Sequence, residues 1–207
     1  MRPTDRCSAC LITLILSTVS CSITPATRVE TVSSQVEALD SAPTQETLGS
    51  EIDGIAGVFS DRNPRLLPAE AAHLARVVVA EAHRAGLPPT FVLAVIEVES
   101  SGRQDAVSEA GALGLMQIMP ATGEFVASQI DVPWRGRESL FDPVINVRLG
   151  VHYLEELIER YANVRTALAA YNAGPGDVSR RIRSGRPIPR DYADKVLAAY
   201  AEAGEEI

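Results

Sequence analysis

The sequence predicts a mostly α-helical domain with one small β element. Three observations lead to this prediction: apolar residues recur at helical spacing after Leu66, prolines and capping residues stand where helices begin, and one glycine-rich stretch interrupts the helices. From Leu66 onward about 140 residues remain, which is enough for one compact domain with a hydrophobic core. We therefore expect residues 66–207 to form a single domain.

Six helices follow from the order of these signals. Pro68, Pro89 and Pro120 each open a run with apolar periodicity, and Asp142 and Asn163 are capping residues in front of two more runs. We expect helices over residues 68–85, 89–100, 120–130, 143–161, 164–173 and 191–203. Between the second and the third helix, the chain is too rich in glycine for a helix interior, so a short hairpin or an extended loop is expected at residues 108–120.

The segment before this domain is predicted to be a leader and a tether. Arg2 and Arg6 precede an apolar stretch that is too short for a membrane-spanning helix of about 20 apolar residues, so residues 1–20 have the pattern of a secretory signal. Residues 22–50 contain five serines and five threonines but few large apolar side chains. We expect residues 21–65 to be a flexible tether.

Cys21 is a candidate lipidation site. The tripeptide TVS in front of it is similar to the lipobox of bacterial lipoproteins, where cleavage leaves the cysteine as a lipid-bearing first residue. The alternative is an ordinary signal that is cut nearby, with Cys21 incidental. The other two cysteines, Cys7 and Cys10, lie inside the leader, so we expect no internal disulfide in the mature chain.

Composition and spacing argue against several classes of function. The chain carries 27 acidic and 19 basic residues, a net charge of −8, so nucleic acid is not an expected partner. The one basic stretch, residues 179–190, is interpreted as a solvated helix and loop, with contact to an anionic polymer as the alternative. No histidines have metal-binding spacing, and no phosphate-binding loop is present. The sequence therefore predicts no metal and no cofactor.

Residues 91–102 carry two glutamates inside an apolar run. On a helix, Glu99 shares the apolar face, whereas Glu97 points from the opposite side, near Leu93, where solvent is expected. Apolar surroundings disfavour the charged form of a carboxyl group and raise its pKa, as a general acid requires. Glu99 is therefore the candidate acid, and the alternative is that it merely ends its helix.

Two further segments fit a sugar-binding surface. The glycines around Met116 let the backbone approach a ligand, and Gln117 offers both a donor and an acceptor. Tyr171 and Asn172 end a helix, where a phenol and an amide can reach a cleft. Each of these residues is more often structural when it is considered alone.

Taken together, the segments resemble three signature motifs in the right order. The motifs are Glu99-Ser100, the stretch SEAGALGLMQIMP at residues 108–120, and AYNAG at residues 170–174. Over about residues 87–196 the chain is similar to the soluble lytic transglycosylase family. A fourth motif of that family is only partly present around Tyr192, where its Glu-Thr step is missing.

The resemblance implies a lysozyme-like fold with a single catalytic acid and base, which falls on Glu99. It implies that the substrate is the glycan strand of peptidoglycan. The substrate-binding residues that follow from the motifs are Ser100, Met116, Gln117, Tyr171, Asn172 and Tyr192. Among them, Ser100 is expected to steady the loop beside the acid, and Tyr171 is expected to hydrogen-bond near Glu99 and orient it.

A single carboxylate is enough when the substrate supplies the nucleophile, as the acetamido group does for substrate-assisted glycosidases. We therefore expect a lyase that cleaves the β-1,4 bond between MurNAc and GlcNAc and leaves 1,6-anhydro-MurNAc ends. The alternatives are a water-using muramidase of the same fold and a lipoprotein that binds glycan without cutting it. The expected location is the periplasm of a Gram-negative bacterium, at a membrane through the lipid on Cys21.

Overall fold

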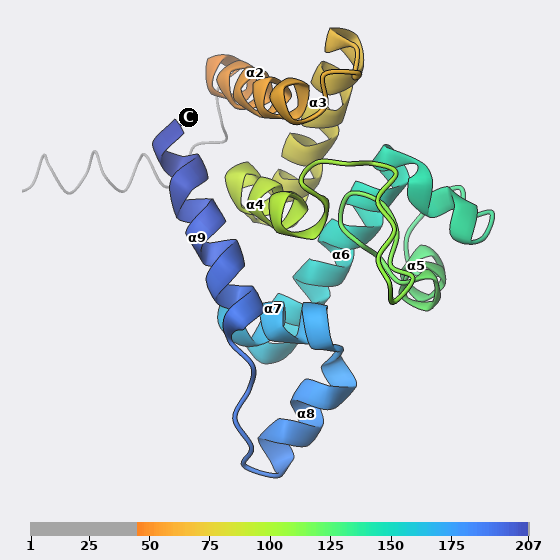
Figure 1. Ribbon diagram of the computed structural model, residues 1–207, viewed down its shortest axis with the longest axis vertical. Helices are drawn as coiled ribbons and strands as arrows, with labels where there is room; N and C mark the ends of the chain where they lie inside the picture. Colours follow the sequence, from red (N-terminus) through yellow and green to blue (C-terminus); the bar gives the residue numbers. More distant parts are fainter. Residues whose placement is uncertain (1–44, 207) are drawn as a thin grey trace, which may run out of the picture. The chain divides into compact units, whose positions relative to one another are not determined.

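The computed structural model describes residues 45–206, and helices make up most of this part of the chain (Figure 1). The predicted mostly α-helical fold is confirmed, and each of the six expected helices is present with small shifts at its ends. The elements are α2 (Gln45–Arg62), α3 (Pro68–Arg84), α4 (Pro89–Ser100), α5 (Pro120–Ala127), the 3₁₀ helix η1 (Arg137–Phe141), α6 (Pro143–Tyr161), α7 (Val164–Ala173), α8 (Pro175–Arg183) and α9 (Asp191–Glu206).

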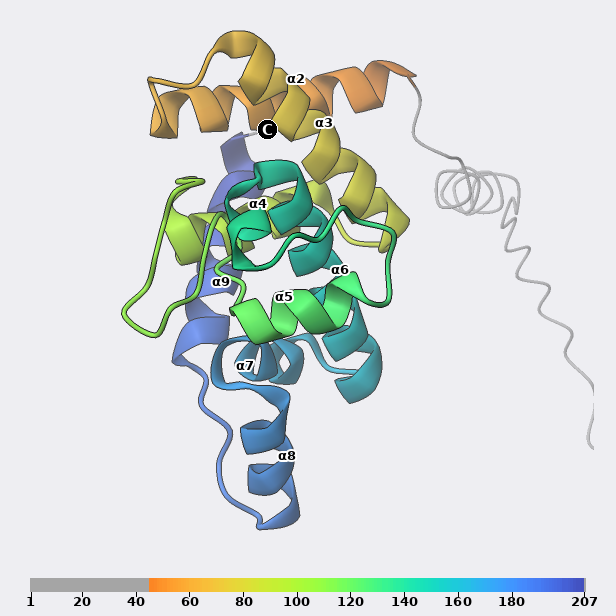
Figure 2. The ribbon, with the colours of Figure 1, turned by 90° about the vertical axis from the view of Figure 1, so that its right-hand side faces the viewer.

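Helix α4 lies at the centre of the domain. Residues 91–96 are all buried, and the helix packs against α3 and α9 (Figures 1 and 2). A helix with neighbours on several sides is apolar all round and not along one stripe. The expectation that the Leu93 side of this helix meets solvent is therefore wrong, because Leu93 is only 4% exposed. The two glutamates stand in the last turn, where the side chains are half-buried.

Helices α6 and α7 begin at the predicted capping residues. The Asp142 side chain accepts hydrogen bonds from the backbone N–H groups of Val144 and Ile145, at 2.9 and 3.2 Å. The Asn163 side chain accepts one from the N–H group of Thr166 at 3.0 Å. These caps satisfy N–H groups that have no partner within the helix. They fix where both helices start. Because α7 is short, its start also determines where Tyr171 and Asn172 lie at its end.

Part of the segment predicted to be a tether is helical. Residues 45–62 form helix α2, which packs against α3 and α4 and belongs to the same compact unit as the rest of the domain. Ile55 and Phe59 of this helix are buried in the core, with 0% and 1% exposure. Burying these two large side chains stabilises the helix on the domain, although its composition is polar. The expected domain boundary at residue 66 is therefore wrong, because α2 is part of the domain.

An extended loop follows α4 and carries the predicted β element. Within it, Leu113 forms isolated antiparallel bridges with Val107 and with Ile118. The expected hairpin or extended loop is thus confirmed, with very little strand pairing in the described chain. Because two bridges contribute little stability, the loop depends on side chains from elsewhere.

Asn146 of α6 supplies this support. Its fully buried amide accepts a hydrogen bond from Met116 N–H and donates to the carbonyl oxygens of Leu113 and Leu140, each at 2.8 Å. Gly114 allows this close approach, because a Cβ there would lie 2.3 Å from Asn146 Nδ2 and the backbone has a φ of +76°. One buried side chain therefore fixes the loop, η1 and α6 together.

The predictions for the first part of the chain lie outside the described residues. This applies to the signal at residues 1–20 and to lipidation at Cys21. None of the helices between residues 45 and 206 has the length and apolar character that a membrane span needs.

Candidate active site

Glu99 lies in the last turn of α4 with its side chain half-buried. The hydroxyl group of Tyr192, on α9, donates a hydrogen bond to Glu99 Oε1 at 2.5 Å. Burial raises the pKa of Glu99 from 4.5 to about 7, and the hydrogen bond from Tyr192 opposes part of this rise. The raised pKa expected from the apolar face is confirmed, and it keeps much of the acid protonated near neutral pH.

Glu97 is separated from this group, as the helical spacing predicted. Its carboxylate forms an ion pair with Arg62 of α2 at 3.2 Å, and its side chain is 30% exposed. The other acidic residues near in sequence, Asp105, Glu109 and Glu124, are exposed. Within residues 45–206, no cluster of histidine, cysteine or acidic side chains has an arrangement able to hold a metal ion.

The pKa of Glu99 has a consequence for stability. Its folded value of about 7 lies above the ordinary 4.5, so the folded state binds this proton more tightly and loses stability as the pH rises from 4.5 to 7. Glutamine does not ionise, so we expect Glu99→Gln to be more stable than the native chain at pH 8 by about 3 kcal/mol, at about 1.4 kcal/mol per pKa unit. At pH 4 the two proteins should be equally stable. Urea unfolding at both pH values measures this difference, and an equal gap at pH 4 and pH 8 would contradict the assignment.

Tyr171 forms a hydrogen bond close to Glu99 but not to Glu99 itself. The Tyr171 hydroxyl donates to the carbonyl oxygen of Met116 at 2.8 Å. The direct hydrogen bond to the acid comes from Tyr192, which the packing of α9 along α4 brings to Glu99. Burial, and next the charge of Glu99, raise the pKa of Tyr171, so the phenol and the acid are close enough to interact electrostatically.

Ser100 holds the loop, as expected, but it is not placed to bind substrate. Its hydroxyl donates hydrogen bonds to the carbonyl oxygens of Leu115 at 2.8 Å and of Ile96 at 3.1 Å. The residue is only 3% exposed. The substrate-binding role predicted for Ser100 is therefore wrong, because a sugar cannot reach a side chain buried in this way.

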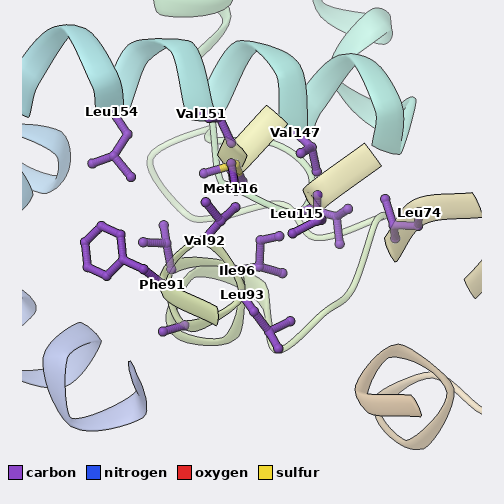
Figure 3. Close-up of a cluster of buried hydrophobic side chains, with 14 of the residues drawn as sticks. Leu74, Phe91, Val92, Leu93, Ile96, Leu115, Met116, Val147, Val151 and Leu154 are labelled. Atoms are coloured by element: carbon purple, nitrogen blue, oxygen red, sulfur yellow. The ribbon is translucent and has the colours of Figure 1, made fainter. Parts of the chain in front are cut away.

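The substrate-binding role predicted for Met116 is also wrong, because this residue is buried as well. Its side chain is fully buried in the hydrophobic cluster that also contains Val92 and Val151 (Figure 3). Gly150 of α6 makes room for it, because a Cβ at that position would lie 2.4 Å from Met116 Sδ. Met119, which is not among the predicted site residues, is 42% exposed and lines the pocket described below. Both residues are methionines in the same motif, so only the structure shows which of them is buried and which is exposed.

A pocket of about 290 Å³ joins the two predicted sugar-binding segments. It combines an amide, an aromatic and an apolar surface, which is the mixture that binds sugars and other polar ligands. The side chains around it include Gln117, Met119, Thr122, Tyr153, Tyr171 and Asn172. A second hollow of about 840 Å³ shares Thr122, Tyr153 and Pro175 with this pocket, so the two hollows adjoin, and we call them together the groove.

Gln117 enters the pocket with a constrained side chain. Its amide nitrogen donates to the carbonyl oxygens of Gly114 at 2.9 Å and of Ala106 at 3.2 Å. The backbone at Gln117 has a positive φ of 47°, which is uncommon for a residue with a side chain. The amide nitrogen is thus occupied within the loop, and the side-chain oxygen remains for a ligand.

A mostly helical domain with one half-buried glutamate of raised pKa is typical of lysozyme-like domains. The chain belongs to the family described as the Transglycosylase SLT domain, which matches residues 76–189. The matched range contains Glu99, the loop and the Tyr171-Asn172 turn, but it ends before Tyr192. The resemblance read from the motifs is therefore confirmed.

Named relatives agree with this family. The soluble lytic murein transglycosylase of Salmonella typhimurium is 38% identical over 91 residues, which are 43% of this chain and 14% of that protein. The membrane-bound lytic murein transglycosylase C of Histophilus somni is 32% identical over 131 residues, which are 58% of this chain and 35% of that protein. This chain therefore spans only a minor part of the length of these relatives.

Solved structures show the same fold. An inactive mutant of the lytic transglycosylase Slt from Pseudomonas aeruginosa, with glutamine in place of glutamate, superposes with a TM-score of 0.58 and 28% identity. The match covers 75% of this chain and 30% of that one. The 70 kDa soluble lytic transglycosylase of Escherichia coli gives the same TM-score at 24% identity, over 80% of this chain and 31% of that one.

Proposed function

We propose that this chain is a peptidoglycan lytic transglycosylase, a lyase that cleaves the β-1,4 bond between MurNAc and GlcNAc. The observation that carries the proposal is the raised pKa of Glu99, about 7, in a carboxyl group held by Tyr192. The relatives named above as murein transglycosylases support the choice of substrate. The inactive Pseudomonas aeruginosa mutant supports an essential glutamate in that protein.

The reaction begins with the protonated Glu99. Its carboxyl proton moves to the glycosidic oxygen as the bond from that oxygen to C1 of MurNAc breaks, so GlcNAc leaves with a free hydroxyl group. The acetamido group of MurNAc stabilises the positive charge that develops at C1, and no second enzymic carboxylate is required. This fits the exposed positions of Asp105, Glu109 and Glu124.

The second step uses Glu99 as a base. Its carboxylate takes the proton of the MurNAc C6 hydroxyl, whose oxygen forms the new bond to C1. The attacking hydroxyl belongs to the reacting sugar, so the step has the advantage of an intramolecular reaction and consumes no water. The product is a 1,6-anhydro sugar, and Glu99 is again protonated.

The test is a digestion of purified peptidoglycan followed by mass spectrometry. A lytic transglycosylase releases fragments with anhydro ends, which are one water lighter than the corresponding reducing ends. Fragments with reducing ends only would assign the domain to water-using muramidases. Binding of peptidoglycan without any soluble product would assign it to non-catalytic glycan-binding proteins.

Tyr192 has a measurable effect on the pH dependence of this reaction. Its hydrogen bond favours the charged form of Glu99, so removing the hydroxyl raises the pKa of the acid further above 7. In Tyr192→Phe we expect the loss of activity at alkaline pH to shift to higher pH, together with a fall in kcat of about 10-fold because the acid is less well oriented. Tyr171→Phe is the control, since its hydroxyl bonds to Met116 and not to Glu99. A pH profile that moves equally in both variants would contradict the role of Tyr192.

The proposal includes export and anchoring. Residues 1–20 act as the signal and Cys21 carries the lipid, so the domain works in the periplasm, tied to a membrane. Substitution of Cys21 by Ser should release the protein from the membrane fraction of the expressing bacterium and abolish incorporation of labelled fatty acid. If the native chain takes up no labelled fatty acid, Cys21 is not lipidated and residues 1–20 are an ordinary secretory signal.

A further inference from the structure

The basic stretch of the chain has no function in the reaction described above. Residues 175–190 contain five arginines and one aspartate, a net charge of +4 in a chain whose total charge is −8. They comprise α8 and the loop that leads to α9, and both views show them extending beyond α7 (Figures 1 and 2). We call this segment, residues 175–190, the arginine arm.

The arm is held on the domain at its base and also near its far end, where Ile188 packs against the hydrophobic cluster that contains Leu157 and Ala167. The Tyr161 hydroxyl donates to the carbonyl oxygen of Pro175 at 3.0 Å, and Val178 is the buried residue of α8. Almost all of the rest of the arm is exposed or half-exposed. The arginines thus extend into solvent from a fixed base, and their charge is not used to build the core.

Most of this positive charge has no internal partner. The Asp177 carboxylate alone serves two arginines, Arg180 at 2.7 Å and Arg181 at 2.5 Å. Arg183 and Arg190 are exposed, and within the described chain neither side chain forms an ion pair or a hydrogen bond. The arm therefore carries a surplus of cationic groups that are available to a partner.

The arm begins and ends next to the candidate active site without contributing an arginine to it. Pro175, its first residue, lines the same pocket as Tyr171 and Asn172. Arg190, its last residue, stands two positions before Tyr192, which bonds Glu99. A polymer lying in the groove therefore passes the foot of the arm, and charged groups that branch from the polymer come within its reach.

We propose that the arginine arm binds the carboxylates of the peptide stems that branch from the glycan strand. This rests on the proposed function, because the ligand is the same polymer. The glycan backbone carries no charge once the lactyl groups are joined to peptides, so the negative charge of peptidoglycan resides in the stem carboxylates. Arginine guanidinium groups pair well with carboxylates. The arm thus discriminates between glycan that bears peptides and glycan that has lost them.

The test compares two soluble polymers, glycan chains with their peptide stems and the same chains stripped by an amidase. The lactyl carboxylates that the amidase frees are converted to neutral methylamides, so that the stripped backbone carries no charge. Affinities are measured by calorimetry on the full chain carrying Glu99→Gln, so that the polymer stays intact. At about 50 mM salt we expect the peptide-bearing chains to bind about 10-fold more tightly, as a few exposed ion pairs allow. In Arg183→Gln/Arg190→Gln this preference should fall to about 2-fold, with unchanged affinity for the stripped chains.

Arg65→Gln/Arg76→Gln is the matched control. These two arginines are also exposed and make no side-chain hydrogen bond or ion pair within the described chain. They lie outside the arm, because Arg65 precedes α3 and Arg76 is within it. This variant should keep the full preference. Equal affinity of the parent for both polymers, absence of binding to either, or a preference that survives in Arg183→Gln/Arg190→Gln would overturn the inference.

Two further measurements separate the possible failures. Vesicles of phosphatidylglycerol test a membrane surface, and arginine-dependent binding to them without preference between the glycans would assign the arm to lipid headgroups and overturn the inference. Cleavage of the stripped chains by the native protein tests the proposed function alone. A native chain that cleaves neither polymer contradicts the proposed function, whereas the preference is measured without cleavage.

Discussion

Replacing Glu99 by glutamine is expected to lower the rate of glycan cleavage by at least about 10²–10⁴-fold, the range that general acid-base catalysis contributes. Glutamine keeps the size of the side chain and still offers an oxygen to the Tyr192 hydroxyl, but it has no proton to give to the leaving group. The measurement is the release of soluble fragments from purified peptidoglycan per unit time. Because glutamate and glutamine differ so little in shape, a loss of rate reports the missing proton.

Glu97→Gln is the matched control for this experiment. It makes the same chemical change two residues earlier on the same helix, at a carboxylate paired with Arg62 on the other side. An exposed ion pair of this kind contributes about 0–1 kcal/mol, so the protein should fold and cleave at close to the native rate. A similar loss of rate in both variants would contradict the assignment of Glu99 as the acid.

The largest expected effect on stability belongs to Asn146→Ala. The change leaves the buried Met116 N–H and the carbonyl oxygen of Leu140 without a partner, whereas the carbonyl oxygen of Leu113 keeps the hydrogen bond from the N–H of Ile118. An unsatisfied buried polar group costs about 1–3 kcal/mol, so we expect a total loss of about 4 kcal/mol in the free energy of unfolding. Urea denaturation of both proteins measures this loss.

Asn163→Ala provides the comparison for Asn146. This asparagine is exposed and caps α7 through one hydrogen bond, so its loss should cost about 1 kcal/mol. Activity should also separate the two variants, since only Asn146 fixes the loop that carries Gln117. Equal losses of stability would show that the loop does not depend on the buried amide.

The parts of the fold that sequence predicted are those with local signals. Prolines and capping side chains, such as Asp142 and Asn163, act on the backbone within a few residues, so they mark helix starts reliably. Helix α2 has no such signal, and its two buried residues, Ile55 and Phe59, stand in a polar segment. Leu48, Ile52, Ile55 and Phe59 do recur at helical spacing, but the polar residues around them led to the prediction of a tether. Contacts with α3 and α4 stabilise the helix.

The candidate site divides in the same way. The face of Glu99 follows from helical geometry, and its raised pKa follows from that face. The choice between Tyr171 and Tyr192 as its partner depends on how α9 packs along α4, and spacing does not encode that. The burial of Met116 depends equally on a glycine far along the chain, Gly150. Sequence thus identified the chemical groups, and three-dimensional packing assigned their contacts.

The contact between Tyr192 and Glu99 joins residues 93 positions apart in the sequence. A ribosome that has made α4 has not yet made the helix that orients its acid. A nascent chain, or one truncated ahead of α9, therefore holds the carboxyl group without its partner. The proton donor of the proposed reaction is therefore aligned only after α9 has been made and has packed along α4.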